Sequence, residues 1–202
     1  MGVTDDQVLV LHVGRIMIEK GLFELVEAIS LAGQQNSKIA SVIVGSKPAF
    51  DETVEVQKKV ATIPGLNGRV KLLPECKPEK VWEYLCAADV FAFPSHNEGM
   101  PNSLLEAMAM GLPSIAFAIP PVNEIEAGTG ALITVPPLDP TLFSEAVLRL
   151  AARPDERLRI GEIAKAQVMD RFVVRRNMAK ALEQLSGLIQ ERKISKSAGV
   201  GR

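Results

Sequence analysis

The sequence predicts an α/β fold: one Rossmann-like, doubly wound parallel sheet of about six strands, followed by C-terminal helices. Short apolar runs alternate with amphipathic stretches as far as about residue 140, and only helical patterns follow. Such alternation is typical of parallel sheets. Hydrophobic residues make up 47% of the 202 residues, which is enough for the core of one domain. We therefore expect one domain over residues 1–191 and a flexible basic tail over 192–202.

Each strand is expected where an apolar run ends in turn-forming residues. The run VLVLHVG at 8–14 is the first, and buried parallel strands read as continuous apolar runs of this kind. Helices are expected where apolar residues recur at helical spacing. The other predicted strands are 39–45, 69–73, 89–93, 113–117 and 131–134. The predicted helices are 21–33, 51–62, 78–87, 102–110, 121–127, 140–152, 154–169 and 173–191.

The segment EGMPNSLLE at 98–106 places two carboxylates, Glu98 and Glu106, on either side of a loop that leads into a helix. A helix N-terminus offers free N–H groups and the positive end of its dipole. With carboxylate acceptors beside it, such a site suits a ligand that carries both phosphate and hydroxyl groups. Ser103 and Glu106 also fit a capping box, which would give Glu106 a structural role instead.

A second group of charged residues follows the first predicted strand. Arg15 and Lys20 lie in the turn between that strand and the next helix, where a cation is disfavoured by roughly 0.3–1 kcal/mol. A phosphate at the helix N-terminus would relieve this, although both side chains could simply be solvated. Because ligands of open parallel sheets bind outside the carboxyl ends of the strands, we expect this turn and segment 98–106 to share one site.

The segments VGRIMIEKG at 13–21 and PSHNEGMPNSLLEAMAMGLPSIAF at 94–117 resemble two motifs of the group 1 retaining glycosyltransferases, also called family 4. The resemblance covers roughly residues 7–185 and matches only the C-terminal, donor-binding domain of that family's two-domain GT-B fold. It implies the transfer of a sugar from a nucleotide-diphosphate sugar to an acceptor hydroxyl, with retention of configuration. The acceptor would bind to an N-terminal domain that this sequence lacks, so the chain alone is expected to be inactive.

The resemblance also implies roles for individual residues. Arg15 and Lys20 would hold the diphosphate, Glu98 would contact the transferred sugar, and Glu106 would bind the ribose hydroxyls. Arg15, Lys20 and Glu98 form the expected catalytic set. The expected donor-binding residues are Gly14, Arg15, Lys20, Cys76, Glu98, Gly99, Met100, Asn102, Ser103 and Glu106.

Two departures from the family pattern bear on these roles. Pro74 stands where many members have Gly at the start of the base-contacting loop near Cys76. Pro120 and Pro121 replace a Gly-rich turn, so Glu124 is given no role.

No cofactor or metal is expected. The chain has no Asp-x-Asp pair, and its two histidines show no metal-ligand spacing. His12, inside a strand, is expected to be a core residue, whereas His96, beside Glu98, either lines the pocket or is solvated. Cys86 is expected to pack in the core.

Charge and hydropathy limit the partners. A net charge of −1 argues against nucleic acid, and no apolar run is long enough for a transmembrane segment. A cytoplasmic location is expected, with peripheral membrane contact of the full enzyme left open.

Three other functions remain. One is a non-catalytic nucleotide-sugar-binding module, and another is half of a two-domain sugar-nucleotide epimerase. The third is a nicotinamide-dependent oxidoreductase, against which the missing GxGxxG motif argues.

Overall fold

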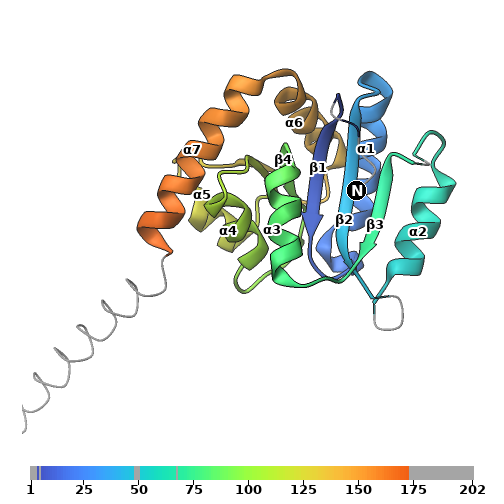
Figure 1. The fold of residues 1–202 in the computed structure, drawn as a ribbon, viewed down its shortest axis with the longest axis horizontal. Coiled ribbons are helices and arrows are strands. Elements are labelled where there is room, and N and C mark those ends of the chain that lie inside the picture. The colour runs from blue at the N-terminus through green and yellow to red at the C-terminus, as the bar shows by residue number, and fades with distance from the viewer. Residues whose placement is uncertain (1–3, 5, 48–50, 67, 173–202) are drawn as a thin grey trace, which may run out of the picture.

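The protein, in this computed structural model, is described over residues 4, 6–47, 51–66 and 68–172. It holds one six-stranded parallel sheet in the order β3-β2-β1-β4-β5-β6 (Figure 1). All six predicted strands are confirmed, to within two residues at each end. They are β1 (Val8–Val13), β2 (Ile39–Ser46), β3 (Val70–Pro74), β4 (Val90–Phe93), β5 (Ser114–Phe117) and β6 (Ile133–Val135).

Seven predicted helices are also confirmed, and the eighth, 173–191, lies outside the described residues. A short 3₁₀ helix, η1 (Ile18–Lys20), was not predicted. The α-helices are α1 (Leu22–Gln35), α2 (Thr53–Thr62), α3 (Pro78–Ala87), α4 (Asn102–Ala109), α5 (Pro120–Glu126), α6 (Pro140–Ala152) and α7 (Pro154–Arg171).

The helices cover both faces of the sheet. On one face α1 packs against α2 and α6, and on the other α3 and α4 pack on β1, β4 and β5. After β6 the chain returns to the first face as α6 and then crosses to pack α7 against α4 (Figure 1). The core between the layers is apolar, with Phe91, Phe117 and Phe143 fully buried. Phe117 of β5 meets Phe143 of α6 edge-on, with ring centroids 5.7 Å apart.

The prediction that Cys86 packs in the core is wrong. Its helix, α3, is amphipathic and buries Leu85, while the next residue, Cys86, is exposed. Successive helical residues point about 100° apart, so only one of these two neighbours can face the sheet fully.

The order of the strands places the topological switch point between β1 and β4. From β1 the chain winds outward through α1 to β2, and from β4 it winds the other way through α4 to β5. The pairing of β1 with β4 is short, because its register covers only Val10 with Val90 and Leu11 with Phe91. Past these pairs the register between the two strands stops, and ligands of such sheets bind outside the carboxyl ends of the strands at the switch point.

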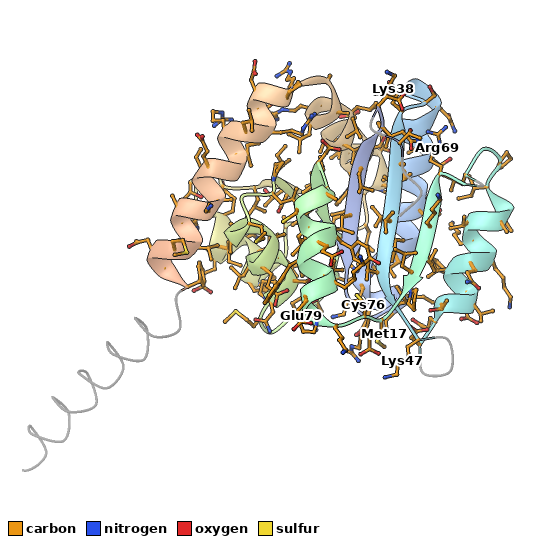
Figure 2. The ribbon with its side chains drawn as sticks, in the orientation of Figure 1. Met17, Lys38, Lys47, Arg69, Cys76 and Glu79 are labelled. Carbon is orange, nitrogen blue, oxygen red and sulfur yellow. The ribbon has the colours of Figure 1, made fainter. Side chains whose placement is uncertain are left out.

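The two edges of the sheet differ in what they carry. Cys76, Met17 and Lys47 gather near the carboxyl edge, whereas Lys38 and Arg69 lie at the opposite end of the molecule (Figure 2). The segments after β1 and β4 are thus on the same edge as Cys76.

Candidate functional site

The loop from β1 to α1 is fixed by bonds to both of its neighbours. Its first amide, on Gly14, donates to Val44 O of β2 at 3.0 Å. The Ile18 amide donates to a carboxylate oxygen of Glu52, whose own amide donates to Ile16 O at 2.8 Å. The Ile16 side chain is fully buried beneath the loop. The loop that carries Arg15 and Lys20 is therefore held in one path before any ligand binds.

Gly21 joins this loop to the one that follows β4. It ends η1 and precedes α1 with φ +68°, a left-handed conformation that glycine adopts without strain. A Cβ atom here would lie 1.8 Å from the carbonyl oxygen of Pro94, which no side chain can do. The His96 amide also donates to Glu19 O, at 3.0 Å. Glycine at this position therefore lets the two loops meet at the switch point.

Lys20 and Glu98 form an ion pair between these two loops. The Lys20 Nζ lies 2.9 Å from Glu98 Oε1, and the two side chains are only 13% and 18% exposed. The Ser95 hydroxyl donates to the same Oε1 at 3.0 Å. The unfavourable position of Lys20 at the start of α1 is thus offset by Glu98 in this structure. Both contacts use one carboxylate oxygen, so Oε2 stays free to accept a hydrogen bond from a ligand.

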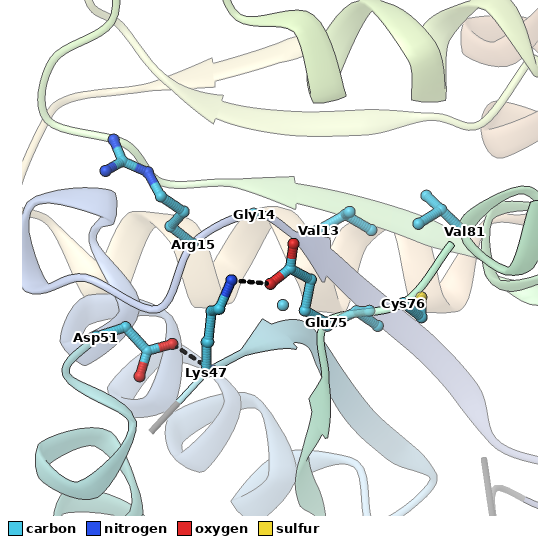
Figure 3. Close-up of a pocket in the computed structure, with 10 residues that line it drawn as sticks. Val13, Gly14, Arg15, Lys47, Asp51, Glu75, Cys76 and Val81 are labelled. Atoms are coloured by element: carbon cyan, nitrogen blue, oxygen red, sulfur yellow. Dashed lines mark hydrogen bonds and ion pairs between the residues drawn. The ribbon is translucent and has the colours of Figure 1, made fainter. Parts of the chain in front are cut away.

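Arg15 contrasts with Lys20. Its side chain is exposed, and no hydrogen bond or ion pair ties its guanidinium to any other described residue. It lines the rim of a cavity of about 500 Å³ beside the carboxyl ends of β1 and β2, together with Gly14 and Cys76. Figure 3 shows the Arg15 side chain extending away from Lys47, which lies across the cavity. Arg15 is thus a cation free to bind a mobile anion.

Three charged residues on this cavity were not predicted. The Lys47 ammonium pairs with Glu75 at 3.0 Å, and the Lys47 amide donates to Asp51 at 2.6 Å (Figure 3). Asp51 also accepts from the Thr53 amide at 3.0 Å, at the start of α2. Burial raises the pKa of Asp51, but hydrogen bonds from Thr53 and the two amides outweigh it and lower that pKa. Lys47 and Asp51 come from the loop after β2 and Glu75 from the loop after β3, so no single sequence motif unites them.

The start of α4 differs from a capping box. The helix begins at Asn102 with Pro101 in the N-cap position, and no side chain caps it. Ser103 therefore lies inside the first turn, two residues past the N-cap position, and the capping interpretation is wrong. The first helical hydrogen bond of α4 runs from Leu105 N–H to Pro101 O at 3.0 Å. The amides of Ser103 and Leu104 therefore precede any helical acceptor and stay available.

The remaining predicted residues lie around this helix start. Gly99, Met100, Asn102 and Glu106 are exposed, and Ser103 is half-buried. The Glu106 carboxylate has no hydrogen bond or ion pair within the described part of the chain. It is thus available to a ligand.

The two histidines occupy different environments. His12 is buried as expected, and its Nδ1 lies 3.0 Å from Ala92 O. Burial lowers its pKa to about 4, so the ring is neutral near pH 7. His96 is half-buried and does not line the 500 Å³ cavity. It stacks on Phe117 at a centroid distance of 6.0 Å, and its Nε2 lies 3.3 Å from Glu24 Oε1. It fastens the loop after β4 to α1.

The sequence of this chain is similar to those of known proteins. The family model described as "Glycosyl transferases group 1" matches residues 2–167. Alpha-D-kanosaminyltransferase from Streptomyces kanamyceticus is 30% identical over 188 residues, which are 93% of this chain and 46% of that protein. The chain thus spans about half the length of this relative.

Solved structures share the fold. HepE from Anabaena, crystallised with UDP, superposes with a TM-score of 0.80 at 21% identity, over 90% of this chain and 49% of HepE. The C-terminal domain of the group 1 protein LpcC from Francisella tularensis gives a TM-score of 0.73 at 22% identity, over 83% of this chain and 87% of that domain. Because the family model spans more than half of its residues, the chain belongs to the group 1 glycosyl transferases.

Proposed function

We propose that this chain is the donor-binding domain of a retaining glycosyltransferase, and that it binds a nucleotide-diphosphate sugar outside the carboxyl ends of β1 and β4. One observation carries the proposal: Arg15, which has no partner in the described part of the chain, and the Lys20–Glu98 pair lie on two loops that meet at the switch point of the sheet. Two cations beside the start of a helix suit a diphosphate. A carboxylate with one free oxygen beside them suits the hydroxyls of a sugar.

The rest of the donor would extend from this centre. The nucleobase would enter the 500 Å³ cavity beside Cys76, because this cavity borders Gly14 and Arg15. The amides at the start of α4, from Gly99 to Ser103, would surround the sugar and phosphate. Glu106, which has no capping role, would accept the ribose hydroxyls.

In the reaction, the bond between the sugar and the diphosphate breaks and the leaving diphosphate gains negative charge. Lys20, held by Glu98, and Arg15 would stabilise that charge, and electrostatic stabilisation of this kind is usually the largest contribution to lowering a barrier. We propose that they do so without a divalent ion. Transfer that survives removal of divalent ions with EDTA would support this.

A complete enzyme would add an N-terminal acceptor-binding domain to the domain over residues 1–191. The proposed location is the cytoplasm, with peripheral membrane contact of the full enzyme left open. Among the described residues, no helix has the length and apolar character needed to cross a bilayer.

Isothermal titration calorimetry tests the ligand class. The chain is titrated with UDP, GDP and ADP, starting with UDP because HepE was crystallised with it. One nucleoside diphosphate should bind, and Arg15→Ala and Lys20→Ala should each weaken it at least tenfold, the size of one lost charge-assisted hydrogen bond. Lys38→Ala is the matched control, since Lys38 is an exposed cation at the opposite end of the molecule. Equal affinities for all four proteins would refute the site.

A further inference from the structure

The end of the ladder between β1 and β4 leaves a backbone carbonyl without a strand partner. The ladder between these strands ends at Leu11 and Phe91, so the next carbonyl on β4, that of Ala92, faces no amide of β1. The His12 ring fills this position, with Nδ1 3.0 Å from Ala92 O. A carbonyl only accepts, so Nδ1 must carry the proton and donate. His12 therefore joins β1 to β4 beside the point where their ladder ends.

The other ring nitrogen of His12 is left with an unused lone pair. With the proton on Nδ1, the neutral ring has a bare acceptor at Nε2. This atom is buried and has no hydrogen-bond partner among the described residues. It points toward Gly14, where a Cβ atom would lie only 3.2 Å from it. An unpaired buried acceptor is rare in folded proteins and calls for an explanation.

Lys20 is the donor that suits this acceptor. An ammonium group has three N–H donors, and the Lys20 Nζ has one partner among the described residues, Glu98. Lys20 and Glu98 are also the two charged groups whose electrostatic effect reaches His12. A neutral imidazole accepts from an ammonium without charge repulsion, so it can hold a lysine without competing with a bound anion.

We propose that His12 is a positioning residue: when a diphosphate binds, His12 Nε2 accepts a hydrogen bond from the Lys20 ammonium and holds it against the diphosphate. The inference rests on the proposed function. In the free protein Glu98 holds Lys20. In the bound state the ammonium turns toward the diphosphate, and His12 takes over part of that hold.

The test uses a pair of variants that separate the two ring nitrogens. In His12→Asn the short carboxamide places an N–H near Nδ1, so it can still donate to Ala92 O, but nothing reaches Nε2. In His12→Gln the longer side chain places its amide near Nε2 and can rescue the acceptor. Calorimetry measures the affinity of each variant for UDP, GDP and ADP. The matching free nucleoside is titrated as well, as a probe without phosphate.

The expected result is a loss of about tenfold in diphosphate affinity for His12→Asn, the size of one hydrogen bond to a charged group. Nucleoside affinity should be unchanged, and His12→Gln should recover part of the loss. The effect of His12→Asn should add to that of Arg15→Ala but vanish in a Lys20→Met background, because only contacting residues couple. A merely structural role would weaken nucleoside and diphosphate alike.

A second measurement tests the proposal even if the His12→Asn protein fails to fold. In the parent protein with ¹⁵N-labelled histidine, the Nε2 resonance should move when the diphosphate binds, and it should not move in Lys20→Met. An unmoved Nε2 resonance in a parent that binds the diphosphate would overturn the role of His12 alone. If the parent binds no nucleoside diphosphate at all, the proposed function fails, and the role of His12 fails with it.

Discussion

At the scale of single residues, the site is defined by which charges are paired and which are not. Lys20 is paired with Glu98, while Arg15 and Glu106 have no partner among the described residues. Exposed, unpaired charges at the carboxyl edge of a sheet contribute little to stability. Substitution of Arg15 or Glu106 should therefore change ligand binding more than folding. The roles of the two carboxylates, Glu106 and Glu98, can be separated by experiment.

Glu106→Gln and Glu98→Gln should affect different parts of the donor. Glu106→Gln should weaken binding of the bare ribonucleotide several-fold and leave the melting temperature unchanged, because Glu106 caps no helix. Glu98→Gln should weaken binding of the nucleotide sugar about tenfold, as expected for the loss of a hydrogen bond to a charged group, and should leave binding of the bare nucleotide unchanged. Calorimetry with both ligands measures this. Equal losses for both ligands in Glu98→Gln would contradict its contact with the sugar.

His12 should make the stability of the protein depend on pH. Burial lowers its pKa from 6.5 to about 4, so between these values the unfolded chain binds a proton that the folded chain refuses. Stability should therefore fall as the pH drops from 6.5 toward 4, by up to about 3 kcal/mol. Urea unfolding at several pH values measures the slope. His12→Asn cannot titrate, so it should show a shallower slope, and identical slopes in both proteins would contradict a neutral His12.

At the scale of elements, α7 is held against α4 by a close contact between two glycines. A Cβ atom on Gly161 of α7 would lie 2.0 Å from the carbonyl oxygen of Gly111, just past the end of α4. Gln167, further along α7, accepts from the Thr129 hydroxyl at 2.8 Å and so ties the helix to the turn before β6. The helix that follows the sheet is thus fixed at both its middle and its end.

Gly161→Ala should lower the free energy of unfolding by about 1–3 kcal/mol, as expected when a packed contact is overfilled. Gly99→Ala is the control, because no atom lies within 4 Å of a Cβ there. That change should leave stability almost unaltered. Urea unfolding of both variants decides between them, and an unchanged midpoint for Gly161→Ala would show that α7 can shift without cost.

The strands could be predicted from the sequence because each is a short, continuous apolar run, and the order of elements then follows from regular alternation. The convergence of the loops after β1 and β4 was also predictable, since carboxyl ends of parallel strands share an edge. Contacts between distant side chains could not be predicted from the sequence. The pairing of Lys20 with Glu98 joins residues 78 positions apart, and Ser103 missed the N-cap because Pro101 takes that position.

At the scale of the whole molecule, the proposed function gives this chain one side of a catalytic cleft, the side that binds the donor. It spans 46% of the length of the kanosaminyltransferase that it resembles. Holding donor and acceptor together in a water-poor cleft can supply roughly 7–11 kcal/mol of a barrier. A domain that binds only the donor cannot supply this lowering of the barrier.

The purified 202-residue chain should therefore transfer no sugar by itself. It should bind the donor weakly and hydrolyse it slowly at most, because the sugar faces bulk water. Addition or fusion of the N-terminal domain of a group 1 relative should restore transfer. A radiolabelled-donor assay with candidate acceptors measures this, and robust transfer by the chain alone would refute the proposed division of roles.

The most direct test is a crystal structure of the chain with the nucleoside diphosphate that binds it. The diphosphate should lie between Arg15 and Lys20 over the start of α1, with the base in the cavity beside Cys76. A diphosphate bound in this way would support the proposed donor site down to its individual residues. A diphosphate bound elsewhere, away from the carboxyl ends of β1 and β4, would contradict it.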